Sequence, residues 1–275
     1  MTEDELLAVA LSSARGAAEV HRRYLGRIRS DEWGEKGIAD FVTRVDMEAE
    51  ERIVAEVRDH FPDHAILAEE GTATAAWPAE GDGSEPEWVW VVDPLDGTTN
   101  FLHGYPMYAA SVAVLHRGAP VAGAVVSAAT GEEWTAVRGG GAFRNGERIG
   151  VSAIDRLPRA LIGTGFPFKA HELLPAYLHQ FDAVLRRTAG IRRAGSAAID
   201  LCYVAAGLLD GFWELDLAPW DYAAGALIVR EAGGVASTPT GAALDARGRG
   251  GVLAGNPIIH AALLDVLAAV QYSSS

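Results

Sequence analysis

The residues most able to do chemistry lie in WVVDPLDGTTNF, Trp90 to Phe101, where an apolar run ends in two aspartates. Asp93 and Asp96 are separated by only a Pro-Leu pair, and Gly-Thr-Thr follows them. Two carboxylates held this close repel each other, which raises their pKa values. A hard divalent cation removes the repulsion, because it takes carboxylate oxygens as ligands. The spacing therefore indicates a metal site, while Asp-Pro and Asp-Gly pairs leave an ordinary turn as the alternative.

Further acidic residues stand at the ends of apolar segments elsewhere in the chain. Glu69 closes a short apolar strand, and Glu214 ends the run Gly-Phe-Trp-Glu, where a charge needs a partner. Asp221 precedes an apolar helical segment, and the helix dipole favours an acid there. Asp46 fits a capping box that begins at Thr43. Each acid has a structural explanation when taken singly, but together they offer an all-oxygen set of ligands.

Other common catalytic patterns are missing from the sequence. The eight histidines show no HExxH or comparable ligand spacing, and no Gly-x-Ser-x-Gly motif is present. There is no P-loop, and no Gly-x-Gly-x-x-Gly follows an apolar strand. An aspartyl-phosphate enzyme would need Asp-x-Asp at a strand end, whereas the spacing here is Asp-x-x-Asp. The most coherent interpretation is an oxygen-ligand site for ions such as Mg²⁺.

The composition restricts the partners of the chain. It has 275 residues and a formal net charge of -14 at pH 7. Nucleic acid is a disfavoured partner, because phosphate contacts supply most non-specific affinity and require a basic surface. An acidic enzyme can still act on a phosphorylated substrate when metal ions supply the positive charge. The length suits one large domain or two closely packed lobes.

The single cysteine, Cys202, lies in an apolar run, which favours a buried core residue over a thiol nucleophile. One cysteine builds no disulfide framework, which is typical of a reducing cytosol. The first residues, MTEDELLAVALSSAR, are acidic where a signal peptide would be positive. No apolar run approaches the ~20 residues of a membrane span. We therefore expect a cytoplasmic protein without a membrane partner.

Hydrophobic periodicity predicts an alternation of helices and strands that changes in character near residue 155. Helices are expected at Leu6–Ile28, Val45–Phe61, Leu173–Arg187, Ala197–Ala206, Trp220–Ala232 and Pro257–Ala269. Strands are expected at Ala65–Ala68, Trp88–Val92, Tyr108–Leu115, Val121–Ser127, Leu161–Gly163, Gly211–Leu215 and Val252–Ala254. Loops are expected at Ser30–Gly37 and Thr72–Glu87, and a tight turn at Asn145-Gly146. The pattern indicates an α+β or α/β protein with two lobes.

Two long motifs carry a resemblance to a known family. They are the stretch from residue 90 to 101 and WDYAAGALIVREAGG, from Trp220 to Gly234. Shorter matches accompany them in family order, namely DFVTRVD (Asp40 to Asp46), AEEG (Ala68 to Gly71), RGGGAFRNG (Arg138 to Gly146), GTGFPF (Gly163 to Phe168) and RAGSA (Arg193 to Ala197). Together they resemble the inositol monophosphatase family of lithium-sensitive, Mg²⁺-dependent phosphatases. Residues 163–169 and 205–214 look most like its bacterial, SuhB-like branch.

The resemblance implies a fold and a division of labour. The fold would be a layered αβαβα sandwich of the sugar-phosphatase type, with two intimately packed lobes. The N-terminal lobe, residues 1–155, would carry most metal ligands. The C-terminal lobe, residues 156–275, would carry the substrate contacts and Asp221. The family is usually homodimeric, so a homodimer is expected.

The resemblance also implies roles for single residues. Two Mg²⁺ ions would be bound by Glu69, Asp93, the carbonyl of Leu95, Asp96 and Asp221, with Glu35 and Lys36 at a weaker third site. Asp46, Glu69 and Thr98 would be catalytic, with Asp46 and Thr98 orienting or deprotonating the attacking water. The substrate would contact Asp96, Gly97, Thr98, Gly195, Ser196, Ala197, Glu214 and Asp221, with the amides of Gly97 and Thr98 on the phosphate.

The expected function is hydrolysis of a small phosphorylated polyol, above all myo-inositol monophosphate. Relatives cleave fructose-1,6-bisphosphate, histidinol phosphate or 3'-phosphoadenosine 5'-phosphate, so these substrates remain alternatives. A nucleotide would need a basic clamp, for which only Arg186-Arg187 and Arg192-Arg193 are candidates. Some bacterial relatives act in RNA-polymerase and ribosome-biogenesis complexes, so an accessory role is a further alternative.

Overall fold

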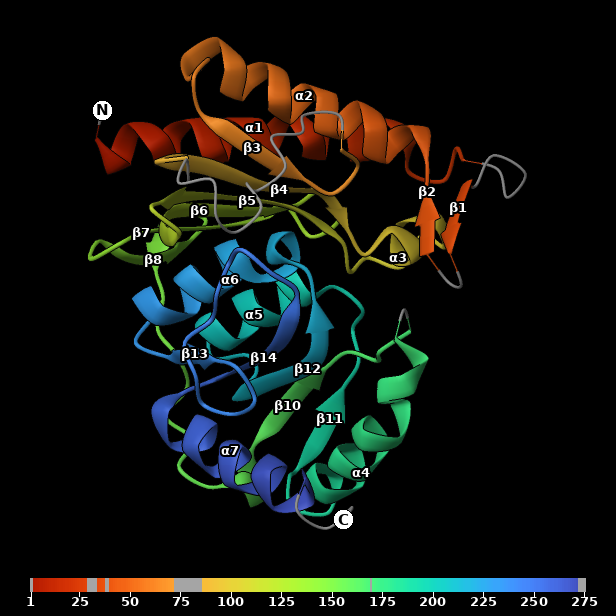
Figure 1. The fold of residues 1–275 in the computed structure, drawn as a ribbon, viewed down its shortest axis with the longest axis vertical. Helices are drawn as coiled ribbons and strands as arrows, with labels where there is room; N and C mark the ends of the chain where they lie inside the picture. The colour runs from red at the N-terminus through yellow and green to blue at the C-terminus, as the bar shows by residue number, and fades with distance from the viewer. Residues whose placement is uncertain (1, 29–33, 38–39, 72–85, 169, 272–275) are drawn as a thin grey trace.

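Five layers make up the molecule, which a computed structural model describes for residues 2–28, 34–37, 40–71, 86–168 and 170–271. A helical pair covers a seven-stranded sheet, a second pair lies between that sheet and a five-stranded one, and a third pair covers the far face (Figure 1). The expected αβαβα sandwich is therefore confirmed.

The helices are α1 (Glu3–Tyr24), α2 (Arg44–His60), α3 (Thr98–Leu102), α4 (Leu174–Leu185), α5 (Ala197–Ala205), α6 (Pro219–Glu231) and α7 (Pro257–Gln271). The strands are β1 (Gly34–Gly37), β2 (Asp40–Val42), β3 (Ala65–Ala68), β4 (Trp88–Asp96), β5 (Ala109–His116), β6 (Ala119–Ser127), β7 (Glu132–Val137), β8 (Gly141–Arg144), β9 (Glu147–Arg148), β10 (Leu161–Thr164), β11 (Gly190–Arg192), β12 (Gly211–Leu217), β13 (Val235–Ser237) and β14 (Gly250–Gly255).

The seven-stranded sheet has the order β3-β4-β5-β6-β7-β8-β9, and only the β3–β4 pair is parallel. Helices α1 and α2 cover one face and α6 packs on the other, so β4 and β5 are apolar on both faces. Along β4, Val89 and Val91 face the α5–α6 layer, whereas Trp90 and Val92 face α1 and α2. This alternation places Asp93 on the α6 side of the sheet.

The five-stranded sheet has the order β11-β10-β12-β14-β13, with β10 parallel to both of its neighbours. Buried side chains of α4 and α7 pack against Trp213 of β12 and Leu253 of β14 on its outer face. Helix α5 packs against α6 inside the sandwich, and its buried face is almost entirely apolar. The inner layer thus links the two sheets and presents the N-termini of α5 and α6 to the region where they meet.

The structure differs from the sequence-based expectation in a few elements. β4 does not end at Val92 but continues to Asp96, and part of the segment expected as a loop forms β1. The short strands β2, β7, β8, β9, β11 and β13 were not expected from periodicity. Of the polar loop expected at 72–87, residues 72–85 lie outside the described residues. The division into lobes near residue 155 stays a prediction. Along the sequence, that residue lies after β9, the last strand of the seven-stranded sheet, and before β10, the first strand of the five-stranded sheet.

A search for membrane-spanning segments found no helix with the length and apolar character to cross a bilayer in the described part of the chain.

Candidate active site

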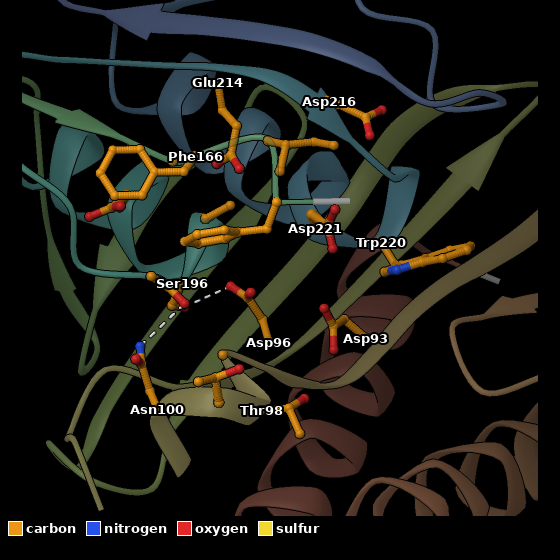
Figure 2. Close-up of a pocket in the computed structure, with 18 of the residues that line it drawn as sticks. Asp93, Asp96, Thr98, Asn100, Phe166, Ser196, Glu214, Asp216, Trp220 and Asp221 are labelled. Carbon is orange, nitrogen blue, oxygen red and sulfur yellow. Dashed lines mark hydrogen bonds between the residues drawn. The ribbon is translucent and has the colours of Figure 1, made fainter. Parts of the chain in front are cut away.

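A pocket of about 330 Å³ is lined by acidic side chains of the seven-stranded sheet and of the second half of the chain (Figure 2). Glu69 follows β3, Asp93 and Asp96 belong to β4, Glu214 belongs to β12, and Asp221 belongs to α6. The structure brings these predicted residues into one pocket together with Leu95, Gly97, Thr98, Gly195, Ser196 and Ala197.

A β-bulge in β4 brings Asp96 to the same side of the sheet as Asp93, so that both aspartates line this pocket. Asp93 pairs with Ser111 and Asp96 with Ala109, so two residues of β4 oppose a single residue of β5. Such a bulge changes the direction of the side chains that follow it. The motif Asp-Pro-Leu-Asp is therefore neither a free turn nor a plain strand end. Both carboxylates stay attached to a buried strand and still reach the pocket.

Asp96 also links the seven-stranded sheet to the start of α5. Its Oδ2 accepts hydrogen bonds from the Ser196 hydroxyl, at 2.6 Å, and from the Ala198 amide, at 2.7 Å. Ser196 is the N-cap residue of α5, and Gly195 before it has φ 92°, a conformation that favours glycine. The Gly-Ser-Ala stretch thus contacts a β4 carboxylate directly, besides lining the pocket.

Asp221 combines a structural and a pocket-lining position. It lies in the first turn of α6, where its Oδ2 accepts a 2.7 Å hydrogen bond from the Ala218 amide. Pro219 at the start of the helix has no N–H to satisfy there. The helix-start explanation and the metal-ligand prediction therefore apply to the same carboxylate.

The carboxylates raise one another's pKa values. Burial raises the pKa of Asp93 well above its ordinary value, and the nearby Glu69, Asp96 and Asp221 raise it further. Burial also raises the pKa of Asp96 to about 6, against the lowering effect of its bonds from Ser196 and Ala198. Burial and the charge of Asp221 raise the pKa of Glu214. A buried cluster of this kind is costly without a cation.

This donor set fits a hard divalent cation, because every acidic ligand candidate offers carboxylate oxygens. As the side chains stand, however, no group of three or more His, Cys, Asp or Glu in the described part of the chain is arranged to hold a metal ion. The Asp93 and Asp221 carboxylates each accept a backbone N–H, from Leu95 at 2.9 Å and from Ala218. The ligand roles of Glu69, Asp93, Leu95, Asp96 and Asp221 stay predictions.

Asp46 and Thr98, the pair expected to handle the attacking water, are in contact, but only Thr98 lines the pocket, and Asp46 is 1% exposed. The Thr98 hydroxyl lies 3.0 Å from Asp46 Oδ1 and 3.0 Å from the Leu95 carbonyl. The predicted capping box is present, because Asp46 Oδ2 accepts the Thr43 amide at 2.8 Å. Burial raises the pKa of Asp46 to about 6, while its bonds to Thr43 lower it.

Glu214 occupies a space that only a glycine leaves open. A Cβ on Gly165 would lie 2.0 Å from Glu214 Oε2, so any side chain there would displace the carboxylate. Glu214 belongs to β12, Gly165 directly follows β10, and both residues line the pocket. The side chains of Glu35 and Lys36, the candidates for a third metal site, lie outside the part of the structure that is described.

Sequence reasoning gave no role to the pocket residues Asn100 and Asp200, and it named Arg193 only as a candidate for a nucleotide clamp. Asn100 Nδ2 lies within hydrogen-bond distance of the carbonyls of Met107, Ala194 and Gly195, which ties the first motif to the segment just before α5. Asp200 is 2% exposed and lines the pocket, and its position in an apolar helix was the available signal. The Cζ atom of Arg193 lies 5.1 Å from the ring centroid of Phe166 and 4.8 Å from that of Phe168. No local sequence pattern predicts this contact.

Cys202 is buried as a free thiol, and burial raises its pKa well above the ordinary value. A thiol in this state is a poor nucleophile. The core-residue interpretation of Cys202 is confirmed.

Comparisons with known proteins agree with this architecture. Residues 2–272 match the sequence profile described as the inositol monophosphatase family. An inositol-1-monophosphatase of Mesorhizobium japonicum is 41% identical over 264 residues, 96% of each chain. A protein of Pseudomonas aeruginosa called Nus factor SuhB is 46% identical over 264 residues, 95% of each chain. The crystal structure of the extragenic suppressor protein suhB from Bartonella henselae superposes with a TM-score of 0.87 at 39% identity, covering 96% of this chain and 98% of that one. The chain therefore belongs to the inositol monophosphatase family.

Proposed function

We propose that the protein is an Mg²⁺-dependent phosphomonoesterase that hydrolyses a phosphorylated polyol, with myo-inositol monophosphate as the leading substrate. The observation that carries the proposal is the convergence of Glu69, Asp93, Asp96 and Asp221 on one pocket. Family membership makes the protein a phosphatase. The Mg²⁺ requirement and the polyol are the parts that need testing.

The ions would be held by Glu69, Asp93, the Leu95 carbonyl, Asp96 and Asp221, and two are expected. Bound divalent ions lower the pKa of water and shield the leaving oxygen in this class of reaction. Asp46 and Thr98 would orient the attacking water, since the Thr98 hydroxyl can take up its proton when Asp46 accepts that of Thr98. The amides of Gly97 and Thr98 are the proposed phosphate contacts.

The alcohol part of the substrate would lie against Gly195, Ser196, Ala197 and Glu214. A carboxylate beside a hydroxyl-bearing N-cap supplies acceptors and donors suited to a polyol. Arg193 is the one residue of the two arginine pairs that lines the main pocket. Its contact with Phe166 and Phe168 places a cation beside the alcohol site, which keeps a bisphosphate among the alternatives.

The test is phosphate release from a panel of inositol 1-phosphate, fructose-1,6-bisphosphate, histidinol phosphate and 3'-phosphoadenosine 5'-phosphate. Each substrate is assayed with Mg²⁺ titrated and with EDTA as the metal-free control. The proposal expects release from inositol 1-phosphate that requires Mg²⁺ and is inhibited by lithium. Full activity in EDTA, or activity confined to the nucleotide, would contradict it.

A second candidate is an accessory role in RNA-polymerase complexes. It is favoured by the relative named Nus factor SuhB, at 46% identity. A scaffold role needs the surface of the protein and not its carboxylate cluster, so the Asp93→Asn variant should still co-purify with RNA polymerase from native extract. Loss of co-purification in that variant would argue against an independent scaffold role.

We also propose a cytoplasmic homodimer. The free, buried thiol of Cys202 suits a reducing compartment. Exposed apolar side chains of Tyr105, Phe168 and Leu208 suit an interface. Light scattering after gel filtration measures the mass directly, and a monomer at micromolar concentration would contradict the dimer.

A further inference from the structure

The β4 bulge leaves backbone groups that the sheet does not pair. Pro94 and Leu95 fall between the last two register partners of β4, Asp93 and Asp96. Both residues are buried, so their carbonyl groups need donors from elsewhere. The Leu95 carbonyl lies 3.0 Å from the Thr98 hydroxyl. The Pro94 carbonyl has a partner 73 residues away, on a different layer of the molecule.

That partner is His21, in the last turn of α1. Its Nε2 lies 2.9 Å from the Pro94 carbonyl oxygen, and the side chain is 0% exposed. A carbonyl oxygen only accepts, so Nε2 must carry the proton and donate it. The other ring nitrogen, Nδ1, is then a lone-pair acceptor, and it has no hydrogen-bond partner among the described residues.

The imidazole is held behind the bulge by two aromatic rings. Its centroid lies 6.0 Å from the ring of Phe101 and 5.9 Å from that of Tyr108, and those two rings contact each other edge to face at 5.1 Å. Phe101 belongs to α3 and Tyr108 precedes β5, so the imidazole packs against the segments that follow β4 and precede β5. Apart from the hydrogen bond to Pro94, position 21 would suit a phenylalanine, because that side chain has no nitrogen to bury without a partner.

We propose that His21 is a positioning residue for the candidate metal site: its hydrogen bond to the Pro94 carbonyl fixes the bulge that turns Asp96 to the same side of the sheet as Asp93, into the pocket. The inference rests on the proposed function, because the direction of the two carboxylates matters only if the pocket binds a divalent ion. Groups that orient metal ligands from behind typically change metal affinity by about 10- to 100-fold when removed.

The experiment compares Mn²⁺ binding to the intact protein without substrate, measured by the loss of the free-ion signal in electron paramagnetic resonance. His21→Phe and His21→Leu remove the donor, and His21→Gln keeps an N–H at nearly the same distance from Cα. Thermal unfolding in EDTA shows which variants fold, and one folded donor-free variant suffices. His21→Phe preserves the ring packing on Phe101 and Tyr108, so we expect it to fold.

His260→Phe is the matched control. His260 is another buried histidine, 7% exposed, with a single side-chain hydrogen bond of 2.8 Å between Nε2 and the Ser237 hydroxyl. It lies in α7, on the far side of the five-stranded sheet from the pocket. The same substitution therefore perturbs a buried imidazole without touching β4.

The donor-free variants should bind Mn²⁺ about 10-fold more weakly than the wild-type protein. His21→Gln should restore most of the loss, and His260→Phe should leave the Mn²⁺ affinity unchanged. A folded donor-free variant with wild-type Mn²⁺ affinity overturns the role of His21 and leaves the proposed function standing. Absence of Mn²⁺ binding by the wild-type protein overturns the proposed function itself and, with it, this role.

Discussion

At the scale of single residues, the site concentrates buried negative charge. Asp93 is 1% exposed, and three other carboxylates raise its pKa in addition to burial. Such a residue lowers the stability of the ion-free protein, because its ionised form loses hydration and gains repulsion. Its presence is explained if a cation compensates the charge in the working state.

The first prediction concerns Asp93→Asn. The amide keeps the size of the side chain and removes the charge, so the ion-free variant should unfold at a higher temperature than the wild-type protein in EDTA. Its Mg²⁺-dependent phosphate release from inositol 1-phosphate should fall close to zero. Asp182→Asn, an exposed acid paired with Arg186 on α4, is the control and should change neither property. Wild-type turnover by Asp93→Asn would refute the ligand assignment.

The second prediction concerns the pH dependence of stability. Burial lowers the pKa of His21 from 6.5 to about 4. Below pH 6.5 the unfolded state takes up a proton that the folded state refuses until about pH 4, so wild-type stability falls as the pH falls through this window. The loss amounts to about 3 kcal/mol.

His21→Phe has no such proton to bind. Urea denaturation in EDTA at pH 7 and pH 4 should therefore show its free energy of unfolding rising relative to the wild-type protein on acidification. A constant difference between the two proteins at both pH values would mean that the imidazole is solvated, contrary to the structure.

Sequence motifs identified the acids of the pocket but not the groups behind them. Asp93, Asp96 and Asp221 lie in motifs whose spacing is itself unusual. His21 lies in an ordinary amphipathic helix, and its hydrogen bond depends on a contact across 73 residues. The positions of Arg193 and Asp200 in the same pocket could not be predicted either, because only the folded structure brings the two residues together. The roles of all predicted site residues stay predictions until they are measured.

At the scale of elements, the second motif does more than supply Asp221. Glu231, at the end of α6, accepts the amides of Gly139 at 2.8 Å and Gly141 at 2.9 Å. Both glycines have positive φ, so the β7–β8 turn is built for this approach. One helix thus offers a pocket carboxylate at its start and anchors a distant turn at its end.

The third prediction is that Glu231→Leu destabilises the fold and spares the site. Losing charge-assisted hydrogen bonds to two amides should lower the free energy of unfolding by about 2 kcal/mol. Chemical denaturation measures this loss, and the Mg²⁺ concentration for half-maximal phosphate release should not change. A shift in that concentration would show that the turn and the pocket are coupled. Glu231→Gln, which keeps an acceptor, should lose less stability.

Long, periodic elements were predictable, and short or irregular ones were not. The apolar repeat of α2 and the continuous apolar runs of β5 and β6 can be recognised directly in the sequence. β9 and β11 have two and three residues, which is too short for a period of two to be recognised. The β4 bulge could not be predicted, because Pro94 suggested a turn. In the structure, Pro94 lies in the bulge and the strand continues after it.

At the scale of the whole molecule, both halves of the chain line the pocket. The seven-stranded sheet provides Asp93 and Asp96, whereas Glu214 and Asp221 come from the second half of the chain (Figure 2). The only direct bonds to the Asp96 side chain that the described residues show come from across this junction, from Ser196 and Ala198. A divalent ion held by carboxylates from both halves of the chain would stabilise their packing against each other as well as its own ligands.

The fourth prediction follows from this linkage. Mg²⁺ that binds only the folded protein should raise the free energy of unfolding by about 2.7 kcal/mol at 100 times its Kd. Thermal unfolding of the wild-type protein should therefore shift upward with added Mg²⁺ as a single transition. Asp93→Asn should show little shift under the same conditions. An equal shift in both proteins would place the stabilising ion elsewhere.

The most direct test of the central claim is anomalous diffraction from crystals of the protein grown or soaked in Mn²⁺. The account predicts anomalous density in the pocket, within ligand distance of Asp93 and shared with Glu69, Asp96 and Asp221. A well-ordered pocket without such density at saturating Mn²⁺, in an enzyme that still releases phosphate, would contradict it.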